Sequence, residues 1–587
     1  MKTTLLIFLT ITLALDVYAG SATWLLNAGD GNWNNASHWI PATIPNGPDD
    51  IATFDVSNTR VPSVFADTEV NSIVFNSGAS AFTITVMPGS TLTVSGTGII
   101  KNSGQTQNFI TEVDDFLNGG DGGSISFTGA ATAGAGSVFS VRGSEGNYAA
   151  QGGHIDFYNS STAGSGSFIN TGSAYAHGGV ASFRDSSTAA AGTFTNYGGA
   201  ATFGGNGKTE FLDNSSAGNA IITNKGATTL ALGGFVDFFG TSTAGNAAIT
   251  NEASSTAYTD GSWTTFWSSS SGGNATITCY GGATGSRGLV DFTDDSTAGN
   301  ATIICHGEPA DGEGGIAFFD QSSTGGTARI ELFGKGTLSL TNREVPKLAV
   351  GSIEGDGFVN IERNGLMIGS NNLSTSFSGI IDDAGLGGSL TKIGNGTLTL
   401  GNANNYTGGT HVKRGSLVVN NTGGSGTGTG PLQVDSGKLG GKGIITGAVT
   451  VGSGGNKPAV LTPGDRGTGL LVIQNTLVFG SNGACHWQFD TRTFQATGAF
   501  AQGVTINNGA TFSASGQGSV QLPLGMVFTR RRHPSRALLP IFLMTEQPLS
   551  AATLSEPTTK AATATISPSP SCRRKFQLLT GSTRSRR

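Results

Sequence analysis

The sequence has little charge, cysteine and proline for its length. Of 587 residues, 12% are charged, 17 are Pro and 4 are Cys. So few cysteines exclude a small fold built on many disulfides. The net charge of −6 argues against nucleic acid as a partner. No segment after Leu15 is long and apolar enough to cross a membrane, so we expect no membrane-spanning segment in the mature chain.

Amphipathic helices are also missing, whereas glycine is abundant. The chain has 93 Gly, and 37% of its residues are hydrophobic, which is too many for a disordered chain. Its apolar residues recur at strand spacing and form no 3.6-residue stripe of ten or more residues, so helical and leucine-rich repeats fit badly.

One sequence repeat occurs eight times between residues 127 and 334; its clearest copies are residues 238–251 and 292–305. A phenylalanine opens each copy, at Phe127, Phe157, Phe183, Phe211, Phe238, Phe266, Phe292 and Phe318. Each copy holds two short stretches of alternating residues separated by a Ser-Thr-Ala-Gly turn, for example Ser242 to Gly245. Stacking such copies predicts an all-β, single-stranded, right-handed parallel β-helix with an N-terminal cap and an irregular C-terminal tail.

The ends of the chain differ from the repeats. Residues 1–19 resemble a secretory signal peptide, and an uncleaved anchor is the alternative. Residues 20–54 contain Trp24, Trp33 and Trp39, which we expect to cap the first coil; a sugar-stacking platform is the alternative. We expect residues 55–126 to form the first coils, 127–334 the repeat array and 335–528 further β-helix. Residues 529–587 are a basic, Pro-rich tail, which we interpret as disordered or frame-shifted.

The repeat alignment predicts a buried ladder at one turn. Asn170, Asn196, Asn224 and Asn251 occupy one inward position, which Cys279 and Cys305 take in the next two copies. In-register coils would make the two cysteines neighbours, about 5 Å apart. Because an exported protein meets oxidising conditions, Cys279 and Cys305 are a possible disulfide, although parallel side chains make its dihedral angle awkward.

A second group of motifs follows the array. The run 388–400 reads GSLTKIGNGTLTL, and NNYTGGT at 404–410 and GSLVVN at 415–420 come after it. These residues resemble the autotransporter-associated β-strand repeat, also called the passenger-associated transport repeat, of secreted bacterial proteins. The resemblance implies a β-helical passenger that is exported and displayed or released at the cell surface, and it brings no catalytic residues.

The sequence departs from such proteins in one respect. Autotransporters of the familiar kind end in a membrane β-barrel, and the chain has no succession of ~10-residue alternating strands at its end. Three explanations of this departure stay open: another protein exports the chain, the chain leaves the cell by a different route, or the end of the sequence is missing.

Motifs for chemistry are few. Gly204 to Thr209 imitates a phosphate-binding loop without its first glycine, and we interpret it as a turn. Gly119 to Gly123 contains one glycine-aspartate motif where calcium binding needs stacked copies. The histidines have no metal-site spacing; they are His38, His154, His177, His306, His411, His486 and His533. We therefore expect no catalytic, cofactor-binding or metal-binding residues, and no cofactor.

An enzyme is nevertheless the alternative. The position before the repeat phenylalanine holds Asp156, Glu210, Asp237 and Asp291, interrupted by Ser182 and Thr265. Stacked carboxylates could cleave polysaccharides by acid–base chemistry. We instead expect a solvated stripe on an exported, non-enzymatic protein with a structural or adhesive role at the cell surface or outside the cell. Its expected partners are the export machinery and a surface glycan or another cell-envelope component, while its oligomeric state stays open.

Overall fold

The computed structural model describes residues 20–113, 120–145, 150–174, 176–202, 204–228, 230–254, 259, 261–282, 286–307, 312–464 and 469–490, with only short strands beyond them. The expected signal peptide, 1–19, and most of the expected tail, 529–587, lie outside the described residues. The chain divides into two compact units, Met1–Phe194 and Thr195–Arg587.

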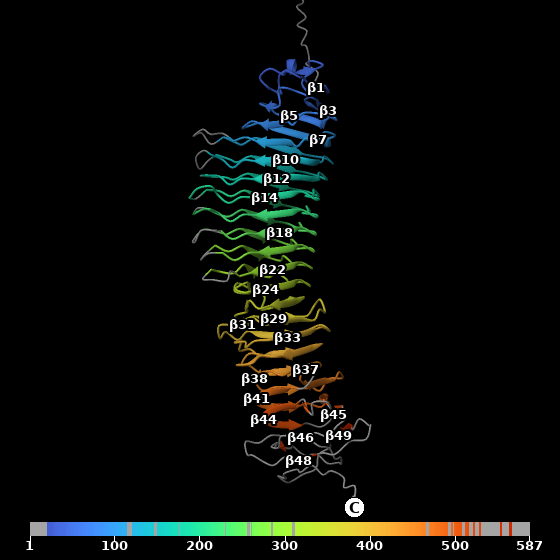
Figure 1. Ribbon diagram of the computed structural model, residues 1–587, viewed down its shortest axis with the longest axis vertical. Coiled ribbons are helices and arrows are strands. Elements are labelled where there is room, and N and C mark those ends of the chain that lie inside the picture. The colour runs from blue at the N-terminus through green and yellow to red at the C-terminus, as the bar shows by residue number, and fades with distance from the viewer. Residues whose placement is uncertain are drawn as a thin grey trace, which may run out of the picture. The chain divides into compact units, whose positions relative to one another are not determined.

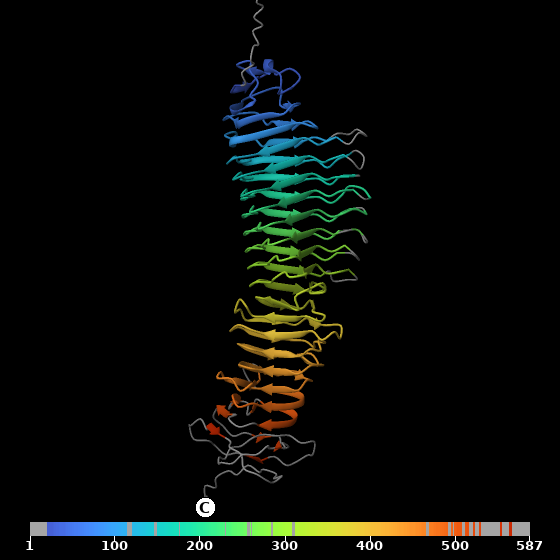
Figure 2. The same ribbon diagram turned by 180° about the vertical axis from the view of Figure 1, so that it is seen from behind.

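Each unit is a parallel β-solenoid, and the described residues contain no α-helix, so the predicted right-handed β-helical fold class is confirmed. Figures 1 and 2 show the strands stacked one above the other within each unit. Successive coils add strands to the same sheets, which we call sheets 1, 2 and 3. Two strands that are neighbours in one sheet are therefore separated along the chain by a strand of another sheet.

In the first unit, sheet 1 contains β1 (Ala22–Trp24), β2 (Trp39–Ile40), β3 (Gly47–Phe54), β5 (Thr68–Phe75), β7 (Thr91–Lys101), β9 (Ser124–Phe127), β11 (His154–Phe157) and β13 (Val180–Phe183). Sheet 2 contains β4 (Ser63–Val64), β6 (Thr83–Val86), β8 (Gln107–Thr111), β10 (Ala135–Val141) and β12 (Ser165–Asn170). One short 3-10 helix, η1 (Ala36–His38), precedes β2, and β14 (Thr193–Asn196) spans the division between the units.

In the second unit, sheet 1 contains β15 (Lys208–Phe211), β17 (Phe235–Phe238), β19 (Trp263–Phe266), β21 (Leu289–Phe292), β23 (Ile316–Phe319), β25 (Thr337–Ser339), β28 (Phe358–Asn360) and β31 (Ile380–Asp382). Sheet 2 contains β16 (Ile221–Asn224), β18 (Ala248–Asn251), β20 (Thr276–Cys279), β22 (Thr302–His306), β24 (Arg329–Phe333), β27 (Ser352–Gly355), β30 (Thr375–Phe377), β33 (Thr397–Leu400), β35 (Ser416–Val419), β37 (Gly437–Gly441), β40 (Ala459–Pro463), β42 (Gly483–Asp490) and β45 (Thr511–Ser515).

A third sheet begins only after the repeat array, at β26. Sheet 3 contains β26 (Lys347–Val350), β29 (Gly365–Ile368), β32 (Ser389–Lys392), β34 (Thr410–Val412), β36 (Leu432–Val434), β38 (Ile444–Ile445), β39 (Val449–Val451), β41 (Leu470–Phe479), β44 (Gly498–Ile506) and β47 (Phe528–Thr529). In the array the third side of each coil has only single bridges, such as Thr243 with Ser271 and Ser271 with Thr297.

A few short strands near the end run antiparallel. They are β43 (Gln495–Ala496), β46 (Gln521–Leu522), β48 (Ala552–Thr553) and β49 (Thr563–Thr565). Of these, β49 pairs with β45, and β46 pairs with β48.

The core of the array is a ladder of stacked phenylalanine rings, because every coil places its repeat phenylalanine at the same inward position. In the second unit, rings of Phe238, Phe266 and Phe292 lie 4.6 Å apart and within 7° of parallel, and all are fully buried. The expected eighth position, Phe318, is wrong. Phe292 pairs with Phe319, which is buried, whereas Phe318 pairs with Asp291 on the outer face.

The turns need glycine at one fixed place. Gly245, which ends the Ser-Thr-Ala-Gly turn, has a φ of +59°, and a Cβ there would lie 2.7 Å from the backbone oxygen of Gly218 in the preceding coil. Glycine therefore supplies both the left-handed conformation and the close approach between coils.

Candidate functional site

Three of the four predicted asparagines form a ladder in the second unit, at the turn that follows sheet 2, while Asn170 ends β12 of the first unit and is fully buried as well. Asn196 Nδ2 donates to Asn224 Oδ1 at 2.7 Å, and Asn224 Nδ2 donates to Asn251 Oδ1 at 2.8 Å. Each amide also donates to a backbone oxygen of sheet 1; for Asn251 this is Leu289 O at 2.7 Å. All three side chains are fully buried. Because each amide bonds to a neighbouring asparagine and to the backbone, the polar groups of the ladder have partners away from water, as predicted.

Cys279 and Cys305 continue this ladder. They are register partners on β20 and β22, as the repeat alignment predicts, and both are fully buried. Asn251 Nδ2 lies 3.6 Å from Cys279 Sγ. The hydrogen bond with Cys279, together with burial, raises the pKa of Cys305. Both are free cysteines in the structure, and their disulfide stays a prediction.

The carboxylates before the repeat phenylalanine form a column only in part. In the second unit, Glu210 pairs with Asp237, while Asp237 and Asp291 each pair with Thr265. Asp156, in the first unit, has Ser126 and Ser182 as its register partners. The structure therefore brings together Glu210 and Asp237, and it separates Asp291 from them by one coil.

The acids of this column differ in electrostatic environment. Glu210 forms an ion pair with Lys208. Burial raises the pKa of Asp237 to about 7, and burial with the nearby charge of Asp320 raises the pKa of Asp291 to about 7. A carboxyl group whose pKa is raised, beside a second acidic residue, is a feature that acid–base catalysis uses.

Access to Asp237 is poor, however. The residue is 9% exposed, and the indole Nε1 of Trp267 donates to its Oδ1 at 3.4 Å. Trp267 stacks on Phe239 with ring centroids 6.0 Å apart, and Phe235 stacks on Trp263 at 5.2 Å. Neighbouring rings are within 9° of parallel, so in each pair one face of each ring is covered by its partner.

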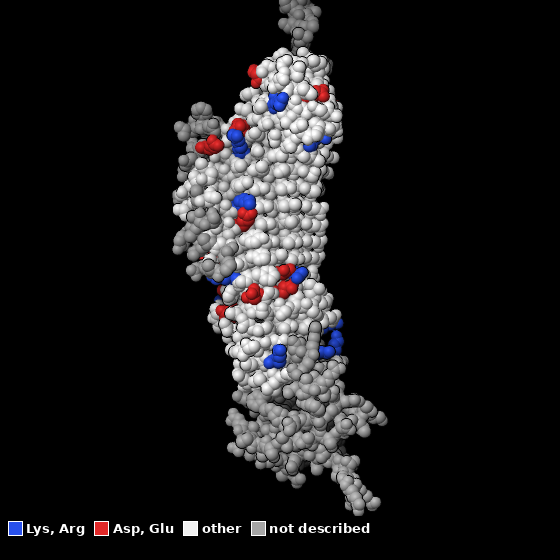
Figure 3. Space-filling view, viewed as in Figure 1, with Lys and Arg blue, Asp and Glu red and all other residues white. Residues whose placement is uncertain are grey.

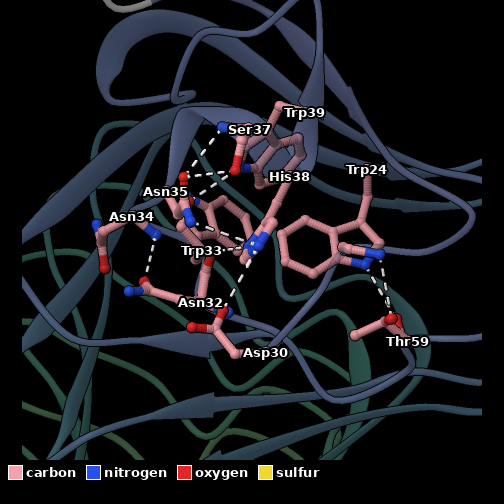
Figure 4. Close-up of polar contacts among 11 residues, drawn as sticks. Trp24, Asp30, Asn32, Trp33, Asn34, Asn35, Ser37, His38, Trp39 and Thr59 are labelled. Atoms are coloured by element: carbon pink, nitrogen blue, oxygen red, sulfur yellow. Dashed lines mark hydrogen bonds and ion pairs between the residues drawn. The ribbon is translucent and has the colours of Figure 1, made fainter.

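The three N-terminal tryptophans are packed inside the cap (Figure 4). Trp24, Trp33 and Trp39 are at most 2% exposed, and Trp39 contacts the other two with ring centroids 4.9 Å apart. Each indole donates to a backbone oxygen, for example Trp39 Nε1 to Trp33 O at 2.8 Å. The expected cap is supported, and the sugar-stacking alternative is wrong because no ring face is free.

The other sequence candidates do not assemble into sites among the residues that the structure describes. Gly204 to Thr209 leads into strand β15, so it lacks the helix that a phosphate-binding loop requires. Gly119 lies outside the described residues. Within the described part of the chain, no cluster of three His, Cys, Asp or Glu side chains could hold a metal ion.

The segment that resembles the passenger repeat contains buried polar side chains that join coils. The carboxylate of Asp383 accepts hydrogen bonds from the backbone N–H groups of Gly387, Gly388 and Thr407 at 2.8–3.0 Å. Burial opposes ionisation, but the hydrogen bonds from Thr407 and the backbone lower the pKa of Asp383. The ammonium of Lys392, almost fully buried, donates to backbone oxygens of Ile393, Gly394 and Arg414, and burial lowers its pKa to about 8.

An open cavity of about 440 Å³ lies on the outer face of sheet 2 in this region. We call it the sheet 2 cavity, and it is lined by Thr397, Thr399, Ser416, Leu417, Val418, Lys438, Gly440, Thr462 and Gly464. Sequence reasoning missed it. A local excess of basic residues in the sequence could have pointed to this region. The cavity itself also depends on the register of four strands, which the sequence pattern does not give.

The comparisons with known proteins agree with the repeat motif. Residues 390–419 match a family model described as Passenger-associated-transport-repeat. No curated protein matches the chain significantly. The family match and the β-solenoid confirm the resemblance predicted from residues 388–420.

Proposed function

We propose, from the premise that the chain is a β-helix with a passenger-associated transport repeat, that it is exported and acts at the cell surface or outside the cell as a non-enzymatic structural or adhesive protein. The observation that carries this proposal is the match at residues 390–419, which lies within the stacked coils of the second unit. In this role, its partners are the export machinery and a glycan or another component of the cell envelope.

The outer faces suit contact with a hydrated surface. Outward positions of sheet 2 carry hydroxyls in register, such as Thr250 beside Thr278. The face drawn in Figure 3 has only scattered charged groups, several of them as neighbouring acidic and basic residues. Lys225 and Glu252 form one such ion pair in the second unit. Regularly spaced hydroxyls both donate and accept hydrogen bonds, which favours contact with sugars.

None of the described residues belongs to a helix that is long and apolar enough to cross a bilayer.

Export is tested by surface accessibility on intact cells. We expect a tagged full-length chain to be cleaved by added protease or found in the medium, and a variant that lacks residues 2–19 to stay protected inside the cell. A cytoplasmic protein serves as the lysis control. Retention of the full-length chain in the cytoplasm would contradict the proposed function.

A polysaccharide-cleaving enzyme is the second candidate, because the pKa of Asp237 is raised to about 7 and its register partner is a second acid, Glu210. The hydrogen bond from Trp267 to the carboxyl of Asp237 favours a structural role for Asp237 and Glu210. We expect no release of reducing ends from neutral or acidic polysaccharides. Release that is lost in the Asp237→Asn variant would instead establish the enzyme.

A further inference from the structure

The sheet 2 cavity lies in the most basic part of the β-helix. Residues 390–464 contain six basic residues and one acidic residue, Asp435, in a chain with a net charge of −6. The basic residues are Lys392, Lys413, Arg414, Lys438, Lys442 and Lys457. All except Lys392 are exposed, whereas Asp435 lies 3.7 Å from His411. On the face shown in Figure 3, the described surface over strands β33 to β37 carries Lys or Arg and no visible Asp or Glu.

The shape of the cavity comes from the register of four strands. Thr399 of β33 pairs with Val418 of β35, which pairs with Gly440 of β37, which pairs with Thr462 of β40. Gly440 has no side chain, so the row of outward side chains is interrupted at its position. A Cβ there would lie 2.7 Å from the backbone oxygen of Thr462, so only glycine fits without a backbone shift.

The lining is rich in hydroxyl groups and includes one cation. Hydroxyls of Thr397, Thr399, Ser416 and Thr462 surround the cavity, and Lys438 supplies the cation. No carboxylate belongs to its described lining. Lys413 and Arg414 precede β35, Lys457 precedes β40 and Lys442 follows β37, so exposed cations lie at both ends of the strands that form it.

We propose that the sheet 2 cavity binds an acidic polysaccharide, with Lys438 contacting a carboxylate or sulfate group and the threonine and serine hydroxyls contacting sugar hydroxyls. The proposal rests on the proposed function, because it gives the adhesive surface a ligand class. Hydroxyls that donate and accept match a sugar, and an ammonium matches its acidic group. Nucleic acid is less well matched, because the described lining has no aromatic ring on which bases could stack.

The test measures binding of the full chain to heparin, which carries sulfates, and to polygalacturonate, which carries carboxylates, with dextran as the uncharged comparison. We expect binding to at least one acidic polymer, weakened by salt because exposed charges are screened. The polymer that is bound identifies the acidic group.

Two variants address the cavity itself. Lys438→Gln should weaken binding about tenfold, which is the loss of one charge-assisted hydrogen bond. Thr399→Tyr should weaken it comparably by filling the cavity without changing the charge, since tyrosine suits a solvent-facing strand. The matched control is Lys347→Gln, the same change at an exposed lysine of sheet 3, which should leave binding unchanged.

Binding that is absent, equal for dextran, or unaffected by both cavity variants overturns the proposal. Stronger binding to double-stranded DNA or to phosphatidylglycerol vesicles, with the same dependence on Lys438, overturns the polysaccharide as its ligand. The proposed function fails separately: a chain that reaches the cell surface and binds no acidic polymer disproves only this inference, whereas cytoplasmic retention disproves the proposed function whatever the chain binds in solution.

Discussion

At the scale of single residues, asparagine forms two ladders that differ in burial. One is the buried ladder of Asn196, Asn224 and Asn251. The other lies on the surface, where Asn246 Nδ2 donates to Asn219 Oδ1 and Asn274 Nδ2 donates to Asn246 Oδ1, both at 3.1 Å. Water can replace the partners of the exposed amides but not those of the buried ones, so equal hydrogen bonds should differ in their effect on stability.

This contrast predicts the outcome of two matched substitutions. Asn224→Ala should lower the free energy of unfolding by about 2–3 kcal/mol, because it leaves a cavity and removes partners of Asn196 and Asn251. Asn246→Ala should change it by about 0.5 kcal/mol or less. Urea unfolding, together with amide hydrogen exchange of β16 and β18, measures both variants. Equal losses would show that burial does not decide the strength of these ladders.

The raised pKa of Asp237 predicts a dependence of stability on pH. The folded state binds this proton to about pH 7, whereas the ordinary value is 3.8, so stability should fall as pH rises from about 4 to about 7. Asp237→Asn should remove the part of that fall due to Asp237, leaving the part due to Asp291, and should stabilise the protein at pH 8 by on the order of 2–4 kcal/mol. Thermal melting against pH checks it, with Asp295→Asn at an exposed position as the control. Parallel melting curves for wild type and Asp237→Asn would contradict the prediction.

At the scale of elements, buried polar side chains join the coils at and next to residues 390–419, the segment that matches the passenger repeat. Asp383 lies at the turn between β31 and β32, and it also accepts from the hydroxyl of Thr407 at 2.7 Å in the next coil. One carboxylate thus fixes its own turn and the approach of the neighbouring coil.

Removing this carboxylate should loosen both turns. Asp383→Ala should cost about 2–4 kcal/mol, because several backbone N–H groups lose a charged acceptor. Since hydrogen bonds lower the pKa of Asp383 in the fold, its contribution is present above the ordinary carboxyl pKa and is lost as pH falls through the lowered value. Hydrogen exchange at Gly387 and Gly388 measures the loosening, with the neighbouring Asp382→Ala as the control. Unchanged protection in Asp383→Ala would show that the turn does not need the carboxylate.

The sequence predicts the elements of the array well because each coil repeats the same inward positions. The phenylalanine spacing predicts the register of sheet 1, and the Asn and Cys positions predict the ladder after sheet 2. The doubled Phe318-Phe319 is ambiguous, because either ring could fill the inward position, and only the pairing of β21 with β23 decides it.

Other features could not be predicted from local pattern. Sheet 3 begins where β26 and β29 pair along four residues, while the array has only single bridges on that side. The sheet 2 cavity depends on Gly440 lying beside Val418 and Thr462, residues far apart in the sequence. The burial of Asp237 likewise depends on Trp267 from the next coil.

At the scale of the whole molecule, the repeating coils make its stability modular. In a solenoid each coil contacts mainly its neighbours, so removing one complete coil should leave two surfaces that fit each other. Phe238 and Phe266 are register partners, and the outward rings of Phe239 and Trp267 stack on each other. Deleting residues 239–266 therefore joins Phe238 directly to Trp267 without changing the register of sheet 1 or sheet 2.

We expect this deletion to fold, with a β-rich circular dichroism spectrum and a melting temperature close to that of the full chain. A shorter deletion, 239–252, removes about half a coil and sets strands of sheet 1 against a turn, so the phenylalanine ladder and the asparagine ladder both lose their register. It should expose apolar side chains and be degraded rapidly by protease. Equal protease resistance of the two deletions would contradict the modular organisation, because the longer loss is tolerated only if whole coils are the units of the fold.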